Sequence, residues 1–155
     1  NYTATIANGG TRYRPHLVRN IKTYDFSETV LDKEVLIDCE TGLSKDNLAI
    51  VREGMRLVAT EGSCRHTFEK LPFDVAAKTG TSQVIKNING VSTITNNGLL
   101  ISFAPADKPE IAVAFIAEGF RSGTRASPIT GQIYEHYFSA TEKATPPQPI
   151  NQVLA

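Results

Sequence analysis

Hydrophobic positions recur with a helical period between Ser44 and Glu61. Leu48, Val51, Met55 and Val58 follow one another at intervals of three or four residues, which places them on one face of an α-helix. The serine that opens this range is a favourable N-cap, and the glycine that follows the range is a typical stop. The pattern predicts a helix whose apolar stripe belongs to the core and not to a ligand site.

Farther along the chain the pattern changes to that of strands. Three segments are rich in β-branched and aromatic residues, namely Asp74–Lys86, Thr93–Phe103 and Glu110–Glu118. Asn89-Gly90 between the first two is a hairpin signal, and Pro105–Pro109 predicts a turn between the second and third. Short connections favour antiparallel neighbours, so these segments predict an antiparallel sheet.

Both ends of this region carry helix signals. Tyr2–Asn8 resembles the last turns of a helix, closed by two glycines suited to a C-cap, and a helix whose start is missing suggests a chain cut from something larger. A last helix is expected to start at Ser127, as an N-cap followed by proline at the first helical position. Its predicted buried face consists of Ile129, Ile133, Tyr137 and Phe138.

Two weaker extended stretches, Arg14–Ile21 and Thr29–Asp38, lie between the first two helices. The fold class predicted from these elements is α/β or α+β, with a mainly antiparallel sheet and the first and last helices on one face. Residues 1–139 would form this unit. Residues 140–155 contain three prolines and few large apolar groups, so a flexible tail is expected there.

Composition excludes several functional classes. The 155 residues include 16 basic and 16 acidic side chains, and the resulting zero net charge argues against a nucleic-acid partner held by bulk charge. No apolar run approaches membrane-spanning length. Cys39 and Cys64 are too few for a disulfide scaffold and lack zinc-ligand spacing, so we expect two reduced, buried or half-buried thiols, no metal and no cofactor. Three scattered histidines have no partner at a telling spacing.

The stretch that carries chemistry is Lys78-Thr79-Gly80-Thr81, because Lys-Thr-Gly is a signature of penicillin-binding proteins and class A β-lactamases. Three residues alone would match by chance in some chains of this length. The surrounding segments also resemble class B penicillin-binding proteins, in that family's order, from residue 2 to about residue 139. They are Ala7-Asn8-Gly9-Gly10, Arg14–Val18, Gly54–Val58, Lys78–Gln83, Ser102–Ala106, Ile111–Glu118 and Ser127–Phe138.

The resemblance implies part of a serine β-lactamase/transpeptidase-like fold and a role in peptidoglycan D,D-transpeptidation. Lys78 would place positive charge beside the C-terminal carboxylate of a D-Ala-D-Ala stem peptide. The hydroxyls of Thr79 and Thr81, two apart on a strand, share a face and can donate hydrogen bonds to that carboxylate. Gly80 leaves room for a substrate backbone. The backbone N–H of Thr81 would form half of an oxyanion hole.

The nucleophile of that family is absent from the sequence. The family needs Ser-x-x-Lys, yet no serine here has lysine three residues on, and neither Ser-x-Asn nor Tyr-x-Asn occurs. Both motifs precede Lys-Thr-Gly in the family, so we expect a truncated chain that is inactive alone. Arg121 and Arg125, on either side of Gly123, could meet a substrate carboxylate, although exposed loop arginines are more often solvated.

Three alternatives stay open at this point: a serine β-lactamase, a β-lactam sensor domain, and a non-enzymatic interaction domain whose Lys-Thr-Gly is accidental. If the resemblance holds, the intact protein would bind stem peptides and β-lactams and work with cell-wall synthesis proteins. It would lie at the extracytoplasmic face of a bacterial membrane, with its anchor upstream. The isolated chain is expected to self-associate through surfaces left uncovered, or to be only marginally stable.

Overall fold

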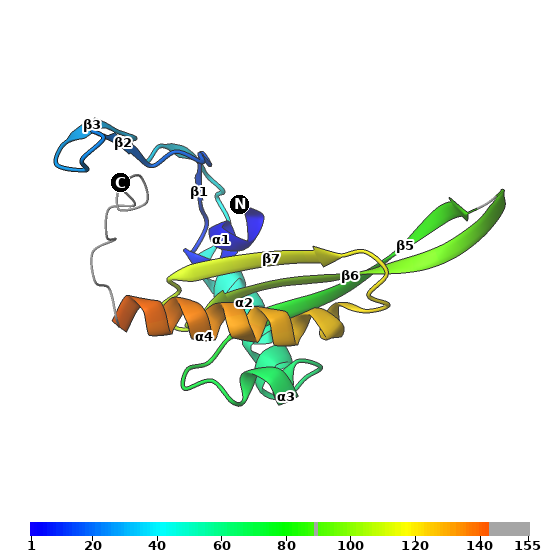
Figure 1. The fold of residues 1–155 in the computed structure, drawn as a ribbon. Coiled ribbons are helices and arrows are strands. Elements are labelled where there is room, and N and C mark those ends of the chain that lie inside the picture. The colour runs from blue at the N-terminus through cyan, green and yellow to red at the C-terminus, as the bar shows by residue number, and fades with distance from the viewer. Residues whose placement is uncertain (89, 143–155) are drawn as a thin grey trace.

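A three-stranded antiparallel sheet forms the centre of the computed structural model, which describes residues 1–88 and 90–142 (Figure 1). Its strands are β5 (Ala76–Ile88), β6 (Val91–Ala104) and β7 (Ile111–Ala117), in the order β5-β6-β7. All three strands predicted from the sequence are confirmed, as is the hairpin between the first two. The fold class, helices with an antiparallel sheet, is confirmed as well.

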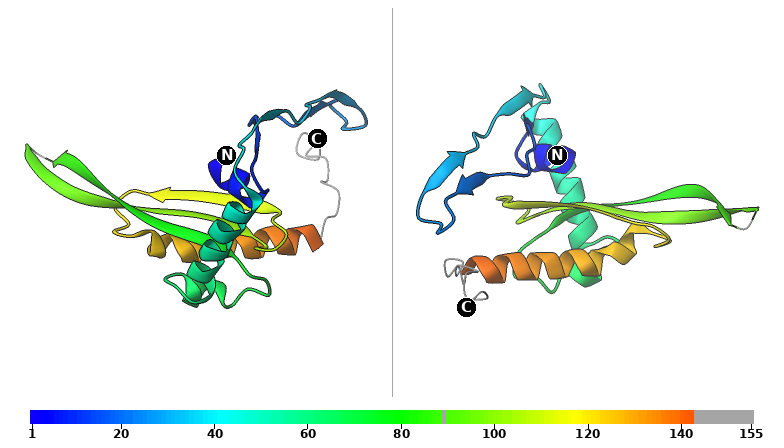
Figure 2. Two further views of the ribbon diagram at one scale, coloured as in Figure 1. Left: turned by 180° about the vertical axis from the view of Figure 1, so that it is seen from behind. Right: turned by 45° about the horizontal axis from the view of Figure 1, so that its top comes forward.

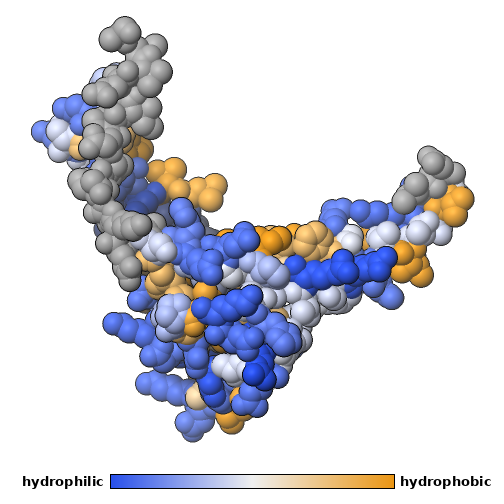
Figure 3. Space-filling view, turned by 60° about the horizontal axis from the view of Figure 1, so that its bottom comes forward, coloured by the Kyte–Doolittle hydropathy of each residue, from blue (hydrophilic) through white to orange (hydrophobic). Residues whose placement is uncertain are grey.

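The pairing of β5 with β6 runs from Ala76 opposite Phe103 to Ile88 opposite Val91 without a shift in register. β7 pairs only with the Gly98–Ala104 part of β6. The two longer strands therefore continue beyond the sheet as a projecting ribbon (Figures 1 and 2). Figure 3 shows exposed hydrophobic residues on this ribbon, where Ile85 and Ile94 are paired across the strands and are 72% and 65% exposed.

The long helix α2 (Lys45–Thr60) begins as predicted, because the Ser44 hydroxyl accepts a hydrogen bond from the backbone N–H of Asn47 at 3.2 Å. Its buried stripe differs from the prediction in one position. Leu48 and Met55 are buried, whereas Val51 is 46% exposed. The helix packs beside β5, and its last turns are followed by the short helix α3 (Arg65–Phe68).

Helices cover both faces of the sheet, so the prediction that the first and last helices share a face is wrong. On one face Ala77 and Leu100 pack with Tyr134 of α4 (Ser127–Glu142). On the other face Ala76 and Phe103 pack with Ile6 of α1 (Tyr2–Ala7). Consecutive strand residues point to opposite faces, which separates the two clusters. The two helices lie on opposite sides of the sheet in Figure 2.

The buried face of α4 also differs from the prediction. Thr130 and Tyr134 are fully buried, whereas Ile129 and Ile133 are 37% and 36% exposed. The polar atoms of the buried pair are satisfied: the Tyr134 hydroxyl donates to Ser102 Oγ at 2.7 Å, and Thr130 Oγ1 donates to a carbonyl one turn earlier at 3.3 Å. Of the predicted face, Phe138 does pack against the core, so apolarity predicted only part of the face that α4 buries.

Ser127 is not an N-cap as predicted, because a single turn of 3-10 helix, η1 (Gly123–Ala126), leads directly into α4. Ser127 already has helical backbone angles there, and its hydroxyl is 2.8 Å from both the Thr124 carbonyl oxygen and Thr67 Oγ1. These contacts tie the start of α4 to η1 and α3.

Residues 11–40 form an arm of two short antiparallel ribbons (Figures 1 and 2). Its elements are β1 (Thr11–Tyr13) paired with β4 (Ile37–Glu40), and β2 (Asn20–Lys22) paired with β3 (Thr29–Asp32). The extended stretch predicted over Arg14–Ile21 is wrong in its bounds, because β1 ends at Tyr13 and β2 begins at Asn20, so residues 14–19 belong to neither strand. The stretch predicted from Thr29 to Asp38 divides between β3 and β4.

Helix α4 extends to Glu142, three residues past the predicted domain boundary at 139. The rest of the predicted tail, residues 143–155, lies outside the described residues. Within the described part of the chain, no helix combines the length and apolarity needed to cross a membrane.

Candidate functional site

The Lys-Thr-Gly motif lies on β5, immediately after two residues that are fixed in the core. Ala76 and Ala77 are fully buried, one in each cluster. From the next residue on, the strand emerges: Lys78 and Thr81 are exposed, and Thr79 is half-buried. The motif is therefore held rigidly at one end and accessible at the other.

β5 is an edge strand, since only β6 pairs with it among the strands that the structure describes. Thr79 and Thr81 lie opposite Leu100 and Gly98, on the α4 face, as the alternation of side chains predicts. Lys78 lies on the other face, and its ammonium group donates a hydrogen bond to the backbone oxygen of Thr79 at 2.9 Å. The ammonium group thus stays beside the strand edge instead of extending into solvent.

The chain itself leaves room at Gly80. A Cβ atom there would meet only Leu99 Cβ at 3.4 Å and Leu99 Cδ1 at 4.0 Å, which are ordinary contacts. Internal packing therefore does not demand glycine at this position. The role assigned to Gly80, close approach of a substrate, stays a prediction.

Two other glycines let the loop before α4 lie close against the sheet: Gly98 on β6 and Gly123 at the start of η1. A Cβ atom on Gly123 would lie 1.8 Å from the Leu99 carbonyl oxygen and 2.7 Å from that of Gly80. One on Gly98 would lie 2.5 Å from the Ser122 carbonyl oxygen. Sequence reasoning missed both contacts, because the two glycines are close only in the folded chain.

Arg121 lies in this loop with a φ of 54°, an uncommon conformation for a residue with a side chain. The Ser122 N–H donates to the Phe120 carbonyl oxygen, so Arg121 is the central residue of a tight turn. Arg121 lines a cavity of about 440 Å³ together with Gln83, two residues beyond Thr81 on β5. Arg125 lines a neighbouring cavity instead.

Two buried groups in the core on the α4 side of the sheet, the Tyr134 hydroxyl and the Cys64 thiol, have raised pKa values. Burial raises the pKa of the Tyr134 hydroxyl well above its ordinary value, only partly offset by the bond to Ser102. Burial likewise raises the pKa of the Cys64 thiol, although nearby hydroxyls and the positive charge of Lys78 act in the opposite direction. Both groups therefore stay protonated at neutral pH. Cys39 is exposed, contrary to the prediction, and neither cysteine forms a disulfide.

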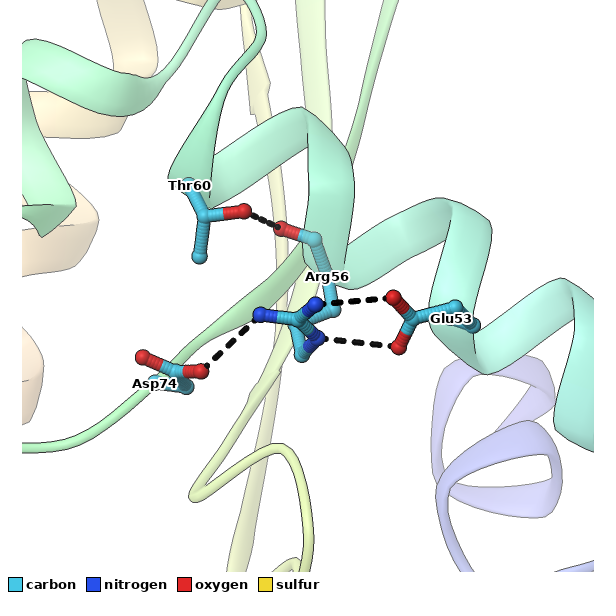
Figure 4. Close-up of polar contacts among 4 residues, drawn as sticks. All are labelled: Glu53, Arg56, Thr60 and Asp74. Atoms are coloured by element: carbon cyan, nitrogen blue, oxygen red, sulfur yellow. Dashed lines mark hydrogen bonds and ion pairs between the residues drawn. The ribbon is translucent and has the colours of Figure 1, made fainter.

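A second polar cluster joins α2 to the start of β5 (Figure 4). Arg56 makes two hydrogen bonds to the Glu53 carboxylate, at 2.8 and 2.9 Å, and one to Asp74 at 3.2 Å. This guanidinium lowers the pKa of Glu53. The cluster borders a cavity of about 670 Å³, also lined by Arg52, whose guanidinium donates to the Ala106 carbonyl oxygen at 3.0 Å. None of the described residues that line this cavity is a serine, threonine or cysteine, and both arginines are already engaged, so the cluster is structural.

No metal centre is present in the part of the chain that the structure describes, where no three histidine, cysteine or acidic side chains gather as a possible ligand set. The three histidines are all exposed.

The arrangement matches known proteins. The family model described as the penicillin binding protein transpeptidase domain matches residues 1–135. The chain belongs to this transpeptidase family. The family predicted from the sequence is thereby confirmed. The relatives carry transpeptidase or penicillin-binding names, and the β-lactamase, β-lactam sensor and non-enzymatic alternatives are not favoured.

Similar proteins cover most of this transpeptidase chain. It is 32% identical to penicillin-binding protein 2A of Bacillus subtilis over 74% of its length, and 31% identical to peptidoglycan D,D-transpeptidase MrdA of Acinetobacter baumannii over 96%. Penicillin-binding protein 2B of Streptococcus pneumoniae superposes over 95% of the chain with a TM-score of 0.72 at 22% identity. The imipenem acyl-enzyme of penicillin-binding protein A from M. tuberculosis superposes over 88%, with a TM-score of 0.72 at 28% identity.

The chain spans only a small part of those proteins. It covers 17% and 23% of the two curated relatives, and 25% and 29% of the two solved chains. What the transpeptidase chain shares with them is thus one region, which includes the Lys-Thr-Gly strand.

Proposed function

We propose that the protein containing this chain is a serine-type peptidoglycan D,D-transpeptidase, and that the chain supplies the wall of its active site that binds the substrate carboxylate. The observation that carries the proposal is the position of Lys-Thr-Gly on an accessible edge strand whose preceding residues are fully buried. The names of the relatives support it, because several are peptidoglycan D,D-transpeptidases.

The reaction needs two acyl transfers. A serine hydroxyl adds to the carbonyl of the penultimate D-Ala, the peptide C–N bond breaks, and the departing D-Ala amine takes the proton. An amine of a second stem peptide then attacks the ester, forms a new amide and returns the proton to the serine. β-Lactams react by the first step only, with the ring C–N bond breaking instead.

The residues of this chain would stabilise the negative charge of the substrate carboxylate and of the oxyanion in those steps. Lys78 places its ammonium at the strand edge, beside the position proposed for the substrate carboxylate. Thr79 and Thr81 direct hydroxyls to one face of the strand, where they can donate to the same carboxylate. The Thr81 N–H would stabilise the oxyanion that forms in each tetrahedral intermediate. Gly80, which the chain's own packing leaves open, would admit the substrate backbone.

The serine in this proposal lies outside the 155 residues, since none of the chain's serines is part of Ser-x-x-Lys. We accordingly propose that the chain alone is inactive. The active protein would function outside the cytoplasmic membrane of a bacterium with other cell-wall synthesis proteins. Stem peptides and β-lactams would be its ligands; two solved structures of penicillin-binding protein A from M. tuberculosis are acyl-enzyme complexes of imipenem and penicillin G.

Intact-mass spectrometry with benzylpenicillin tests the division of roles. The 155-residue chain should show no mass increase, whereas the full-length protein should gain one penicilloyl group. A stoichiometric adduct on the chain alone would contradict the proposed location of the nucleophile. Failure of the full-length protein to react would refute the proposed function.

Substitution of the lysine tests its role. In the full-length protein, Lys78→Ala should slow acylation by roughly a hundredfold or more, as expected when a charged group that stabilises the transition state is removed. Lys86→Ala is the matched control, because Lys86 lies on the same strand but pairs with Glu118 at 2.7 Å. Equal acylation rates for the two variants would remove Lys78 from the mechanism.

A further inference from the structure

The cavity beside Arg121 continues the proposed site along β5. Gln83 lines it and follows Thr81 on the same face of the strand, about 7 Å farther along. Asn96, opposite Gln83 on β6, contributes a second polar side chain. The cavity therefore offers hydrogen-bonding amides and one cation next to the residues proposed to bind the substrate.

The charge of Arg121 is not neutralised within the described residues. Its guanidinium makes no hydrogen bond or ion pair with any of them. The carboxylate nearest in sequence, Glu118, is bound to Lys86. A cation that lines a cavity without a partner from the described chain is suited to bind an anion.

The backbone of Arg121 adopts a positive φ, which is energetically unfavourable for a residue with a side chain. Arg121 is the central residue of a tight turn with a φ of 54°, and such conformations persist only where the surroundings impose them. Close contacts hold the loop around this turn, because Gly98 of β6 lies against Phe120 and Ser122, and Gly123 lies against the backbone of Leu99 and Gly80. Arg121 is thus held at a set place relative to Gly80.

The proposed function sets the direction of the substrate. Its C-terminal carboxylate lies at Lys78 and Thr79, and its scissile carbonyl lies at the Thr81 N–H. The residues that precede the scissile bond must then continue toward Gln83, antiparallel to β5. Gln83 is also one of the residues that line the cavity beside Arg121.

We propose that Arg121 is a specificity-determining residue that binds a second carboxylate of the peptide substrate, carried by a residue on the acyl side of the scissile bond. The inference rests on the proposed function and adds a preference for anionic acyl donors. Gln83 and Asn96 would complete the site as neutral hydrogen-bonding partners.

Two penicillins provide a matched pair of probes for the full-length protein. Carbenicillin differs from benzylpenicillin by one carboxylate on the acyl side chain. Second-order acylation rates would be measured for both compounds with the unmodified protein and with Arg121→Gln, Arg121→Lys and Arg125→Gln. Arg125 is the control because it is an exposed arginine of the same loop that lines a different cavity.

Arg121→Gln should lower the carbenicillin rate roughly tenfold, the effect of one charge-assisted hydrogen bond, and the benzylpenicillin rate less than about twofold. Arg121→Lys should recover most of the carbenicillin rate, and Arg125→Gln should leave the ratio of the two rates unchanged. An equal loss with both penicillins, or no loss with either, would overturn the inference alone. If neither penicillin acylates the unmodified protein, the proposed function fails and the inference with it.

Discussion

The close approach of Gly123 to the β5–β6 sheet gives a sharp test of the structure. In Gly123→Ala the new methyl carbon would lie 1.8 Å from the Leu99 carbonyl oxygen, although ordinary van der Waals contact begins near 3.4 Å. The loop or the strand must therefore retreat by about 1.6 Å, the difference between those distances. The atoms in the way belong to backbone, which cannot rotate aside as a side chain can.

The expected cost is at the upper end of the range for overpacking, about 3 kcal/mol. For a chain of this size each kcal/mol corresponds to roughly 2–4 °C in melting temperature, so the variant should melt roughly 6–12 °C lower. Thermal unfolding of the 155-residue chain, followed by circular dichroism at one protein concentration, measures this.

Gly54→Ala supplies the matched control. It adds the same methyl group to an exposed position of α2, where nothing lies within 4 Å of the new atom. Because alanine favours helix over glycine, this variant should gain up to about 1 kcal/mol and melt slightly higher than the unmodified chain. Gly123→Ala melting at or above the temperature of Gly54→Ala would refute the close approach of loop and strand.

Two further predictions concern stability and assembly. Tyr134→Phe should cost about 1–3 kcal/mol, because the buried Ser102 hydroxyl loses its donor. Because the pKa of Tyr134 is raised in the folded chain, the unfolded chain loses this proton first as pH rises above about 10. The unmodified chain should therefore lose stability between pH 8 and pH 11, and Tyr134→Phe should lose less. Urea unfolding at the two pH values measures this, and an equal loss in both proteins would contradict it. The isolated chain should self-associate or be marginally stable, because it exposes large hydrophobic residues such as Leu17, Tyr24 and Ile116; a monodisperse, high-melting monomer in analytical ultracentrifugation would contradict that expectation.

The sequence predicted those elements whose local signals agree with their burial. Ser44 caps α2 because its hydroxyl accepts from the Asn47 N–H, one of the first-turn N–H groups that lack a partner within the helix. The hairpin forms where the sequence has turn residues between two strand-like segments. The strands of the arm are not predictable in the same way, because strands of three or four mostly exposed residues show no alternation of apolar and polar side chains. A hydrophobicity pattern could not anticipate that α4 buries Thr130 in place of Ile129.

The candidate site divides in the same way. Lys78, Thr79, Gly80 and Thr81 can be identified from the sequence, because they are consecutive residues of a known motif. The roles of Gly98 and Gly123 depend on contacts between segments that lie far apart in sequence, such as Gly123 with Gly80. The sequence shows Arg121 as a cation in a loop, but the turn at Arg121 and the cavity beside it are formed only when the chain folds.

The unbroken register of β5 and β6 restricts where the length of this chain can change. One residue inserted between Ala77 and Lys78 would turn the threonine hydroxyls to the opposite face of the sheet, because side chains alternate. Two inserted residues would restore the face but carry the motif about 7 Å away from Gly123. Beyond Gln83 the ribbon leaves the sheet, and a matched extension of both strands there would leave the pairing nearer the core intact. Insertions and deletions among natural variants, and peptide tags added by an experimenter, should therefore be tolerated at the far end of this hairpin and rejected at its base.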